Sequence, residues 1–237
     1  MSCQSSKGAG DSLEVVRGPS LFGASATGWL LGEAVRHLNS TDQEGALSYQ
    51  RVVELLRRCS KDLLETVGGL FRQERSGGAG VRWNLLYVLG DAADAGAAEF
   101  LVSAALEKLP EANPDHGCEG PRDVEMLVST MAIQALHRIA GRHPEASEAL
   151  LKIVAAQPAR PLLVEAVKAA TELGLKDKVR EILPEDSRWI LEIRRVRIGE
   201  VFADPEREDG KERGFTPPRT GALYTAPRVG CCTAKEK

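Results

Sequence analysis

The sequence has little of several features that mark particular classes of protein. Aromatic residues make up only 5% of its 237 residues, while alanine and leucine are frequent. This composition favours helices over β-sandwiches and β-barrels, whose strands are rich in aromatic and β-branched side chains. No run of eighteen apolar residues occurs, so we expect no membrane-spanning helix. The first residues also lack the basic and then apolar segments of a secretory signal, and we expect none.

Cysteines are few and scattered, and none of the five forms a Cys-x-x-Cys pair. An odd, dispersed set is a poor disulfide framework, so we expect a reducing, cytoplasmic location. Cys231 and Cys232 are adjacent, but residues 233–237 follow them, whereas prenylation requires a cysteine at a fixed place near the end. Lipid attachment at this pair is therefore not expected.

Positive charge is scarce in the middle of the chain. Residues 81–187 hold 11 basic and 17 acidic side chains, although the whole chain has a net charge of only −3. Nucleic-acid binding depends on positive charge along the phosphate backbone. We therefore expect a protein partner rather than a nucleic acid.

Motifs for catalysis and cofactor binding are also missing. We find no Gly-x-Ser-x-Gly elbow, Walker loop or dinucleotide fingerprint. Asp115, His116, Cys118 and Glu119 lie close together and could form a partial metal site or simply a polar loop. Because zinc requires about four ligands and no second Cys/His pair is near, we predict a loop, with no metal and no cofactor.

What the chain does have is helical periodicity, which begins at Ala24. Thr41 with Glu44 three residues later has the form of a capping box, and Ser60 can cap a further helix. Three glycines within residues 77–80 mark a break. We interpret residues 1–23 as a loose leader.

The end of the chain is harder to interpret. Residues 188–199 fit either a basic helix or a short strand, and we favour a terminal helix because a lone strand would have no partner. Residues 201–237 hold glycine, proline and mixed charge with little apolar periodicity, and we predict a disordered tail.

Between these segments the chain repeats one plan three times. Residues 81–109, 123–156 and 161–183 each predict two amphipathic helices, and an insertion at residues 110–122 separates the first two units. We predict that the first helices of the three units end at Gly90, Gly141 and Gly174. Since a helical hairpin cannot bury both apolar faces alone, neighbouring hairpins must stack.

The best-defined unit carries a family resemblance. Residues 81–91, VRWNLLYVLGD, followed by the turn at residues 94–98, resemble the short HEAT-like helical repeats also found in bilin lyases. The resemblance implies an all-α fold, an α-solenoid of stacked antiparallel helix hairpins over residues 24–200, clearest at 81–183. It specifies a fold and not an activity.

Candidate binding residues follow from this repeat interpretation. The second helices of stacked hairpins usually line a curved array and create a concave face, and their polar flanks would bind a partner. The residues concerned are Glu99, Ser103, Glu148, Lys152, Lys178 and Glu181. Glu148 and Lys152 also have the spacing of a helix-supporting ion pair.

Other conspicuous side chains have structural interpretations. At a hairpin turn, Asp91 and Asp94 fit helix caps better than paired catalytic carboxylates. Trp83 and Trp189 could stack on a ligand, but packing between helices is the commoner use of such residues.

The leading hypothesis is a non-catalytic protein-binding scaffold or adaptor. Two alternatives remain open: a lyase-like or tetrapyrrole-handling protein, through the resemblance to bilin lyase repeats, and nucleic-acid binding in a groove like that of HEAT-type DNA glycosylases. The acidic middle of the chain argues against the second alternative.

Overall fold

The computed structural model describes residues 22, 25–74, 78–111 and 120–193, and every regular element in these ranges is helical. In chain order the elements are α1 (Ala26–Leu38), α2 (Gln43–Arg57), α3 (Ser60–Gln73), α4 (Ala79–Ala92), η3 (Ala95–Ala97), α5 (Ala98–Ala105), α6 (Pro121–Arg142), η5 (Pro144–Ala146), α7 (Ser147–Ala155), α8 (Arg160–Glu172), α9 (Lys176–Ile182) and η6 (Glu185–Glu192). The predicted all-α class is confirmed. None of these helices is both long and apolar enough to cross a membrane.

The ends of the chain are described only in part. The predicted tail at residues 201–237 lies outside the described residues, and so does the predicted leader apart from Phe22. Phe22 is buried, and its ring lies close to Gly32 of α1. Of the predicted terminal helix at residues 188–199, residues 188–192 belong to the 3₁₀-helix η6, Ile193 follows it in an extended conformation, and residues 194–199 lie outside the described ranges.

The structure does not contain the two helix caps that the sequence predicted for α2 and α3. The N-cap of α2 is Asp42, whose carboxylate accepts a hydrogen bond from the Gly45 N–H at 2.5 Å. A charged acceptor adjacent to the first turn replaces the expected Thr41–Glu44 capping box. Ser60 does not cap α3, and its hydroxyl instead accepts the Asp94 N–H at 3.1 Å.

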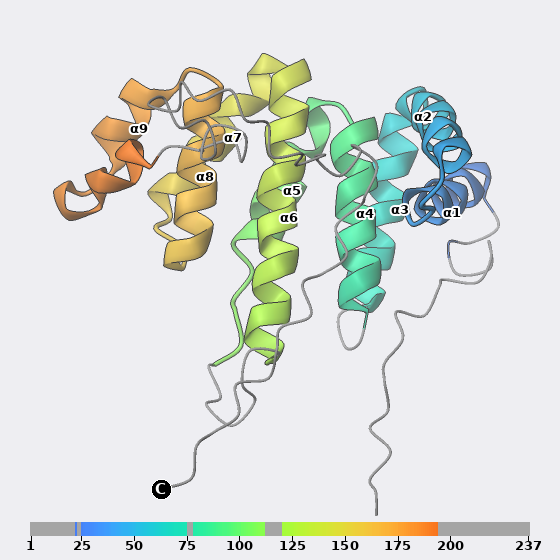
Figure 1. Ribbon diagram of the computed structural model, residues 1–237, viewed down its shortest axis with the longest axis horizontal. Coiled ribbons are helices and arrows are strands. Elements are labelled where there is room, and N and C mark those ends of the chain that lie inside the picture. Colours follow the sequence, from blue (N-terminus) through green and yellow to red (C-terminus); the bar gives the residue numbers. More distant parts are fainter. Residues whose placement is uncertain (1–21, 23–24, 75–77, 112–119, 194–237) are drawn as a thin grey trace, which may run out of the picture.

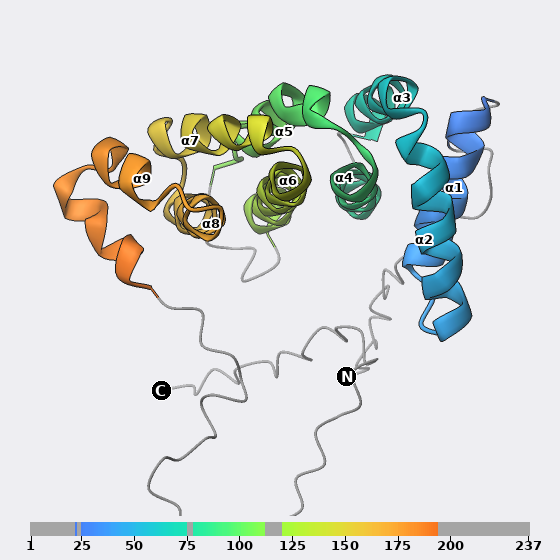
Figure 2. The ribbon, with the colours of Figure 1, turned by 90° about the horizontal axis from the view of Figure 1, so that it is seen from above.

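The helices form two rows. Figure 1 shows α4, α6 and α8 standing side by side. In Figure 2 these three helices form an inner row and α3, α5 and α7 form an outer row behind them. The paired helices α1 and α2 close one end, while α9 and η6 extend past the other end on the inner side (Figure 2). From α3 to α8 the chain alternates between the two rows, while α9, the second helix of the third predicted unit, lies past their end (Figure 2).

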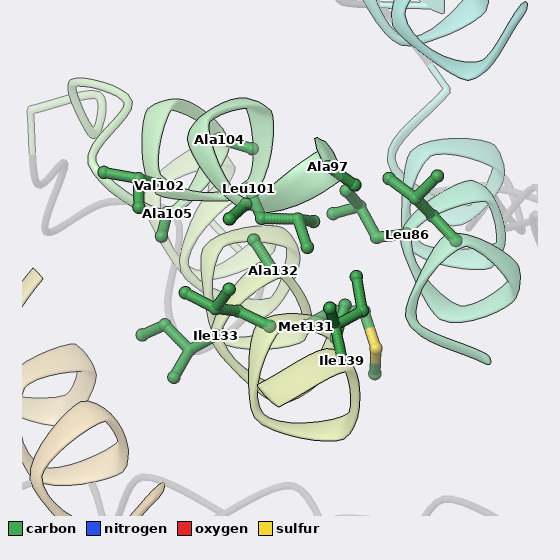
Figure 3. Packing of buried hydrophobic residues seen from close by; sticks show 14 of the residues in the cluster. Leu86, Ala97, Leu101, Val102, Ala104, Ala105, Met131, Ala132, Ile133 and Ile139 are labelled. Atoms are coloured by element: carbon green, nitrogen blue, oxygen red, sulfur yellow. The ribbon is translucent and has the colours of Figure 1, made fainter. Parts of the chain in front are cut away.

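The core lies between the two rows. Figure 3 shows Leu101 of α5 directed toward Ala132 of α6, with Leu86 of α4 close by. All three side chains are fully or almost fully buried. Alanines supply much of this interface, so the helices of neighbouring rows approach closely.

Gly90 is part of this close packing and does not end a helix. α4 continues to Ala92, so the prediction that Gly90 ends the helix is wrong. A Cβ at Gly90 would lie 2.7 Å from the Cα of Ala135 and 2.7 Å from a guanidinium nitrogen of Arg138. Glycine is therefore required by the approach of α6 to α4.

The other two repeat glycines behave differently. Gly141 lies inside the last turn of α6, which runs to Arg142, and a Cβ added there would have no neighbouring atom within 4 Å. Gly174 does follow the end of α8, with φ of +81°. The N–H of Leu175 bonds to the carbonyl of Ala170 at 3.0 Å, which completes a Schellman cap.

Arg82 is the largest of the fully buried side chains and lies in α4. Both of its terminal nitrogens bond to the carboxylate of Glu125 on α6, and its guanidinium lies 5.5 Å from the centre of the Phe71 ring on α3. A buried arginine is tolerated only when its charge is paired. The ion pair therefore joins α4 to α6, and the contact of the same guanidinium with Phe71 adds α3 of the outer row.

Replacing Gly90 by alanine tests the close approach of α4 and α6. We expect Gly90→Ala to lower the free energy of unfolding by about 1–3 kcal/mol, because the new methyl group meets backbone that cannot move aside. The matched control is Gly141→Ala, which adds the same methyl group in open space and should be neutral or stabilising by up to about 1 kcal/mol. Urea unfolding measures the free energy of unfolding of both variants. Equal values for the two variants would contradict the proposed role of Gly90.

Replacing Glu125 by glutamine tests the buried ion pair. We expect Glu125→Gln to destabilise by about 2–4 kcal/mol, because it leaves the Arg82 charge buried without a counter-charge. Glu99→Gln makes the same change in an exposed pair and should cost no more than about 1 kcal/mol. Thermal unfolding compares the stabilities of the two variants. A loss of stability for Glu125→Gln no greater than that for Glu99→Gln would show that the buried ion pair is no more important than an exposed one.

Candidate functional site

The residues proposed from the sequence lie on α5, α7 and α9. From the sequence we expect the second helices to line the concave side of the array. Figure 2 instead places α5 and α7 in the outer row, so these two helices do not line the inner side. Glu99 of α5 pairs with Lys152 of α7, and Glu148 of α7 pairs with Lys178 of α9 at 2.5 Å. Four of the six residues are thus brought together in two ion pairs that cross between helices.

The expected Glu148–Lys152 pair within α7 is replaced by these crossing pairs. Glu148 and Lys152 each form an ion pair with a side chain on another helix, and these pairs replace the one that their four-residue spacing allows within α7. All four side chains are more than half exposed, and pairs of this kind contribute little to stability. Ser103 and Glu181 are also exposed. Binding of a partner by these residues remains a prediction.

A second surface lies on the opposite side of the molecule. We call it the inner face: the side of α4, α6 and α8 that is turned away from α5 and α7. By helical spacing and exposure it comprises Trp83, Tyr87 and Asp91 of α4, Asp123, Leu127, Gln134, His137 and Arg138 of α6, and Glu165, Lys168 and Glu172 of α8.

Polar contacts between helices hold the inner face together. Gln134 of α6 donates to Glu165 of α8 at 3.3 Å, and His137 lies 3.5 Å from Glu172. On the other side of α6, the Nε of Arg138 lies 2.9 Å from a carboxylate oxygen of Asp91. The three helices are therefore fixed in register across this face.

Asp91 is the centre of a cluster that also includes α2. Its second carboxylate oxygen accepts a hydrogen bond from the Tyr49 hydroxyl at 2.8 Å. Burial, and next the negative charge of Asp91, raise the pKa of Tyr49 well above its ordinary value. Tyr49 therefore remains a hydrogen-bond donor at any physiological pH. Asp91 does not cap a helix, whereas Asp94 does, through the Gly96 N–H at 2.9 Å.

Three arginines bind the carbonyl groups near the end of α4. Arg138 donates to the carbonyl of Tyr87, Arg57 to that of Asp91, and Arg142 to those of Gly90 and Ala93 at 2.8 and 3.1 Å. The last carbonyls of a helix have no partner within it, and they favour positive charge. Burial and the nearby Arg57 guanidinium lower the pKa of Arg142.

Aromatic side chains form one end of the inner face. The rings of Trp83 and Tyr87 stack with centroids 5.4 Å apart, and the Arg138 guanidinium lies 4.3 Å from the Tyr87 ring centre. Trp83 is half-buried. Trp189 of η6 is 43% exposed and lies beneath the guanidinium of Arg160 at 4.6 Å.

Leu127 is the most exposed large apolar side chain among the described residues, at 62%. It lies one turn after Asp123 and two turns before Gln134, on the central helix of the inner row. Because α4, α8 and the outer row pack against the other sides of α6, Leu127 faces outward from the inner face.

Sequence reasoning did not consider this surface, because it predicted the binding residues on the second helices. The available signal was the four-residue spacing of Trp83, Tyr87 and Asp91, which puts two aromatic rings and a carboxylate on one side of a first helix. The partners of these residues on α2 and α6 could not be read from spacing alone.

No cluster of three or more metal-ligand side chains occurs within the described ranges. His116 and Cys118, the candidate partial metal site, lie outside them. Comparison of the chain with protein families, with curated proteins and with solved structures finds no match.

The Asp91 cluster can be tested by removing one hydroxyl group. Tyr49→Phe should destabilise by about 1 kcal/mol, because Asp91 loses a hydrogen-bond partner in a partly buried place. Tyr87→Phe is the matched control, since the Tyr87 hydroxyl makes no hydrogen bond to a described residue. In urea unfolding we expect the double variant Tyr49→Phe/Asp91→Asn to lose less free energy of unfolding than the sum of the losses of the two single variants. Additive losses would show that the two side chains do not interact.

Proposed function

We propose that this protein is a non-catalytic scaffold or adaptor that binds a polypeptide segment on its inner face. The observation that carries the proposal is the exposure of Leu127 on the central helix of that face, whose neighbours carry a stacked aromatic pair on α4 and charged side chains on α8. Protein-binding surfaces commonly combine exposed apolar and aromatic side chains with a polar rim, and the inner face carries all three kinds of group.

The charges of the inner face indicate the chemistry of the partner. By formal charge the inner face is acidic: it holds four carboxylates and two cationic side chains other than His137, namely Asp91, Asp123, Glu165, Glu172, Arg138 and Lys168. Within this set Asp91 contacts Arg138, and Glu165 and Glu172 contact Gln134 and His137 of α6. We infer that the partner segment presents basic side chains together with an aliphatic or aromatic one. The basic groups would meet the carboxylates, and the apolar group would contact Leu127.

The arrangement of helices supports the HEAT-like part of this proposal. From α3 to α8 the helices alternate between an outer and an inner row (Figure 2), which is the arrangement expected of stacked hairpins. We propose that this is an α-solenoid of the HEAT-like kind. Arrays of this type commonly bind extended segments along one curved side.

One observation favours the tetrapyrrole alternative. The stacked Trp83–Tyr87 pair, with Arg138 over the Tyr87 ring, could accept a planar anionic ring system. Mixing the protein with a bilin would then give a shifted visible absorbance band that Trp83→Ala abolishes. An unchanged bilin spectrum would remove this alternative.

The scaffold proposal is tested with a displayed library of random peptides. We expect enriched peptides to be net basic and to carry an aliphatic or aromatic residue. In fluorescence anisotropy, Leu127→Glu should weaken binding of an enriched peptide about 10- to 100-fold, because it removes a buried leucine contact and adds a charge.

Leu55→Glu is the matched control, because Leu55 is another exposed helical leucine, located on α2. It should leave peptide binding unchanged. Equal effects of the two substitutions, or enrichment of acidic peptides, would contradict binding on the inner face.

A further inference from the structure

The outward side of α2 carries apolar side chains where a terminal helix is expected to be polar. Leu47 and Leu55 are 49% and 46% exposed, two turns apart on one side of the helix. Terminal units of stacked helical arrays need a polar outer face to stay soluble. Exposed leucines at this end therefore indicate a surface that another polypeptide covers.

Charged side chains lie on the same side of α2 as the two leucines. Glu44, Arg51 and Arg58 are exposed and seven residues apart, so they lie along one side together with the two leucines. None of the three makes an ion pair with a described residue. We call Glu44, Leu47, Arg51, Leu55 and Arg58 the α2 stripe.

We propose that the α2 stripe is a self-association surface, on which a second copy of this chain binds with its α2 antiparallel. An antiparallel pair centred on Arg51 places Leu47 opposite the partner's Leu55 and Glu44 opposite the partner's Arg58. Each contact then occurs twice, as two-fold symmetry requires. The stripe is thus complementary to itself both in apolar contact and in charge.

The seven-residue spacing suits this pairing geometrically. Helices with such a repeat pack at about 20° to each other, so contact extends along the whole helix and does not stop at one crossing point. At the two-fold axis of this dimer, Arg51 lies opposite Arg51 of the second copy. Its aliphatic stem covers the leucines while its guanidinium extends into water. One helix pair buries less surface than a standard interface, so the dimer is weak.

Charge reversal tests this pairing without relying on apolar truncation. Sedimentation equilibrium of the full chain, over about 1–500 µM protein, should show a concentration-dependent dimer. Glu44→Arg places arginine opposite arginine, and Arg58→Glu places glutamate opposite glutamate. We expect each variant alone to dimerise at least tenfold more weakly than the unmodified chain.

An equimolar mixture of the two variants should restore dimerisation, because both contacts again join opposite charges. The double variant, with both reversals in one chain, should dimerise for the same reason. Leu127→Glu on the inner face is the control and should leave the dimer unchanged. Circular dichroism checks that every variant is folded.

Three outcomes would overturn the proposal. A monomer at every concentration would show that no second copy covers the stripe. A dimer that both single reversals leave intact would place the interface elsewhere. A mixture that remains monomeric while each single variant is folded would rule out the antiparallel pairing of Glu44 with Arg58.

Discussion

The contact of α4 with α6 at Gly90 and Ala135 is the constraint on which the other interactions depend. A side chain at Gly90 has no room, so the two helices approach as closely as their backbones allow. At that separation Arg138 reaches both Asp91 and the carbonyl of Tyr87. A wider spacing would bury less apolar surface between the rows and would separate these polar partners.

The end of α4 shows how the polar groups depend on that packing. Its carbonyls are bound by arginines from α2 and α6, and its Asp91 carboxylate joins Tyr49 to Arg138. These groups would be orphaned if either neighbouring helix moved away. Apolar packing brings the helices together, and the polar contacts then select one register for α2, α4 and α6. That fixed register is what gives the inner face a defined shape.

The sequence was sufficient for the all-helical class and for the approximate positions of most helices, because both depend on local periodicity. It was insufficient where a neighbouring helix decides the outcome. Gly90 and Gly174 look alike in sequence, yet one permits a close helix contact and the other adopts a positive φ at a helix end. Likewise, Glu148 and Lys152 have ideal spacing for pairing within α7, but α5 and α9 offer partners to both. The polar contacts of the inner face also cross between helices, so spacing within one helix does not reveal them.

The two proposed surfaces would serve different purposes because they lie on different helices. The inner face belongs to α4, α6 and α8, and the α2 stripe belongs to the helix pair that closes one end of the rows (Figure 2). Association through α2 would leave both inner faces open and would present two of them in one assembly. A partner with two binding segments could then occupy both faces, and the second binding event would be intramolecular. Even a weak dimer would therefore raise the apparent affinity for a bivalent partner well above that of one inner face. The partner would in turn stabilise the dimer, since linkage acts in both directions.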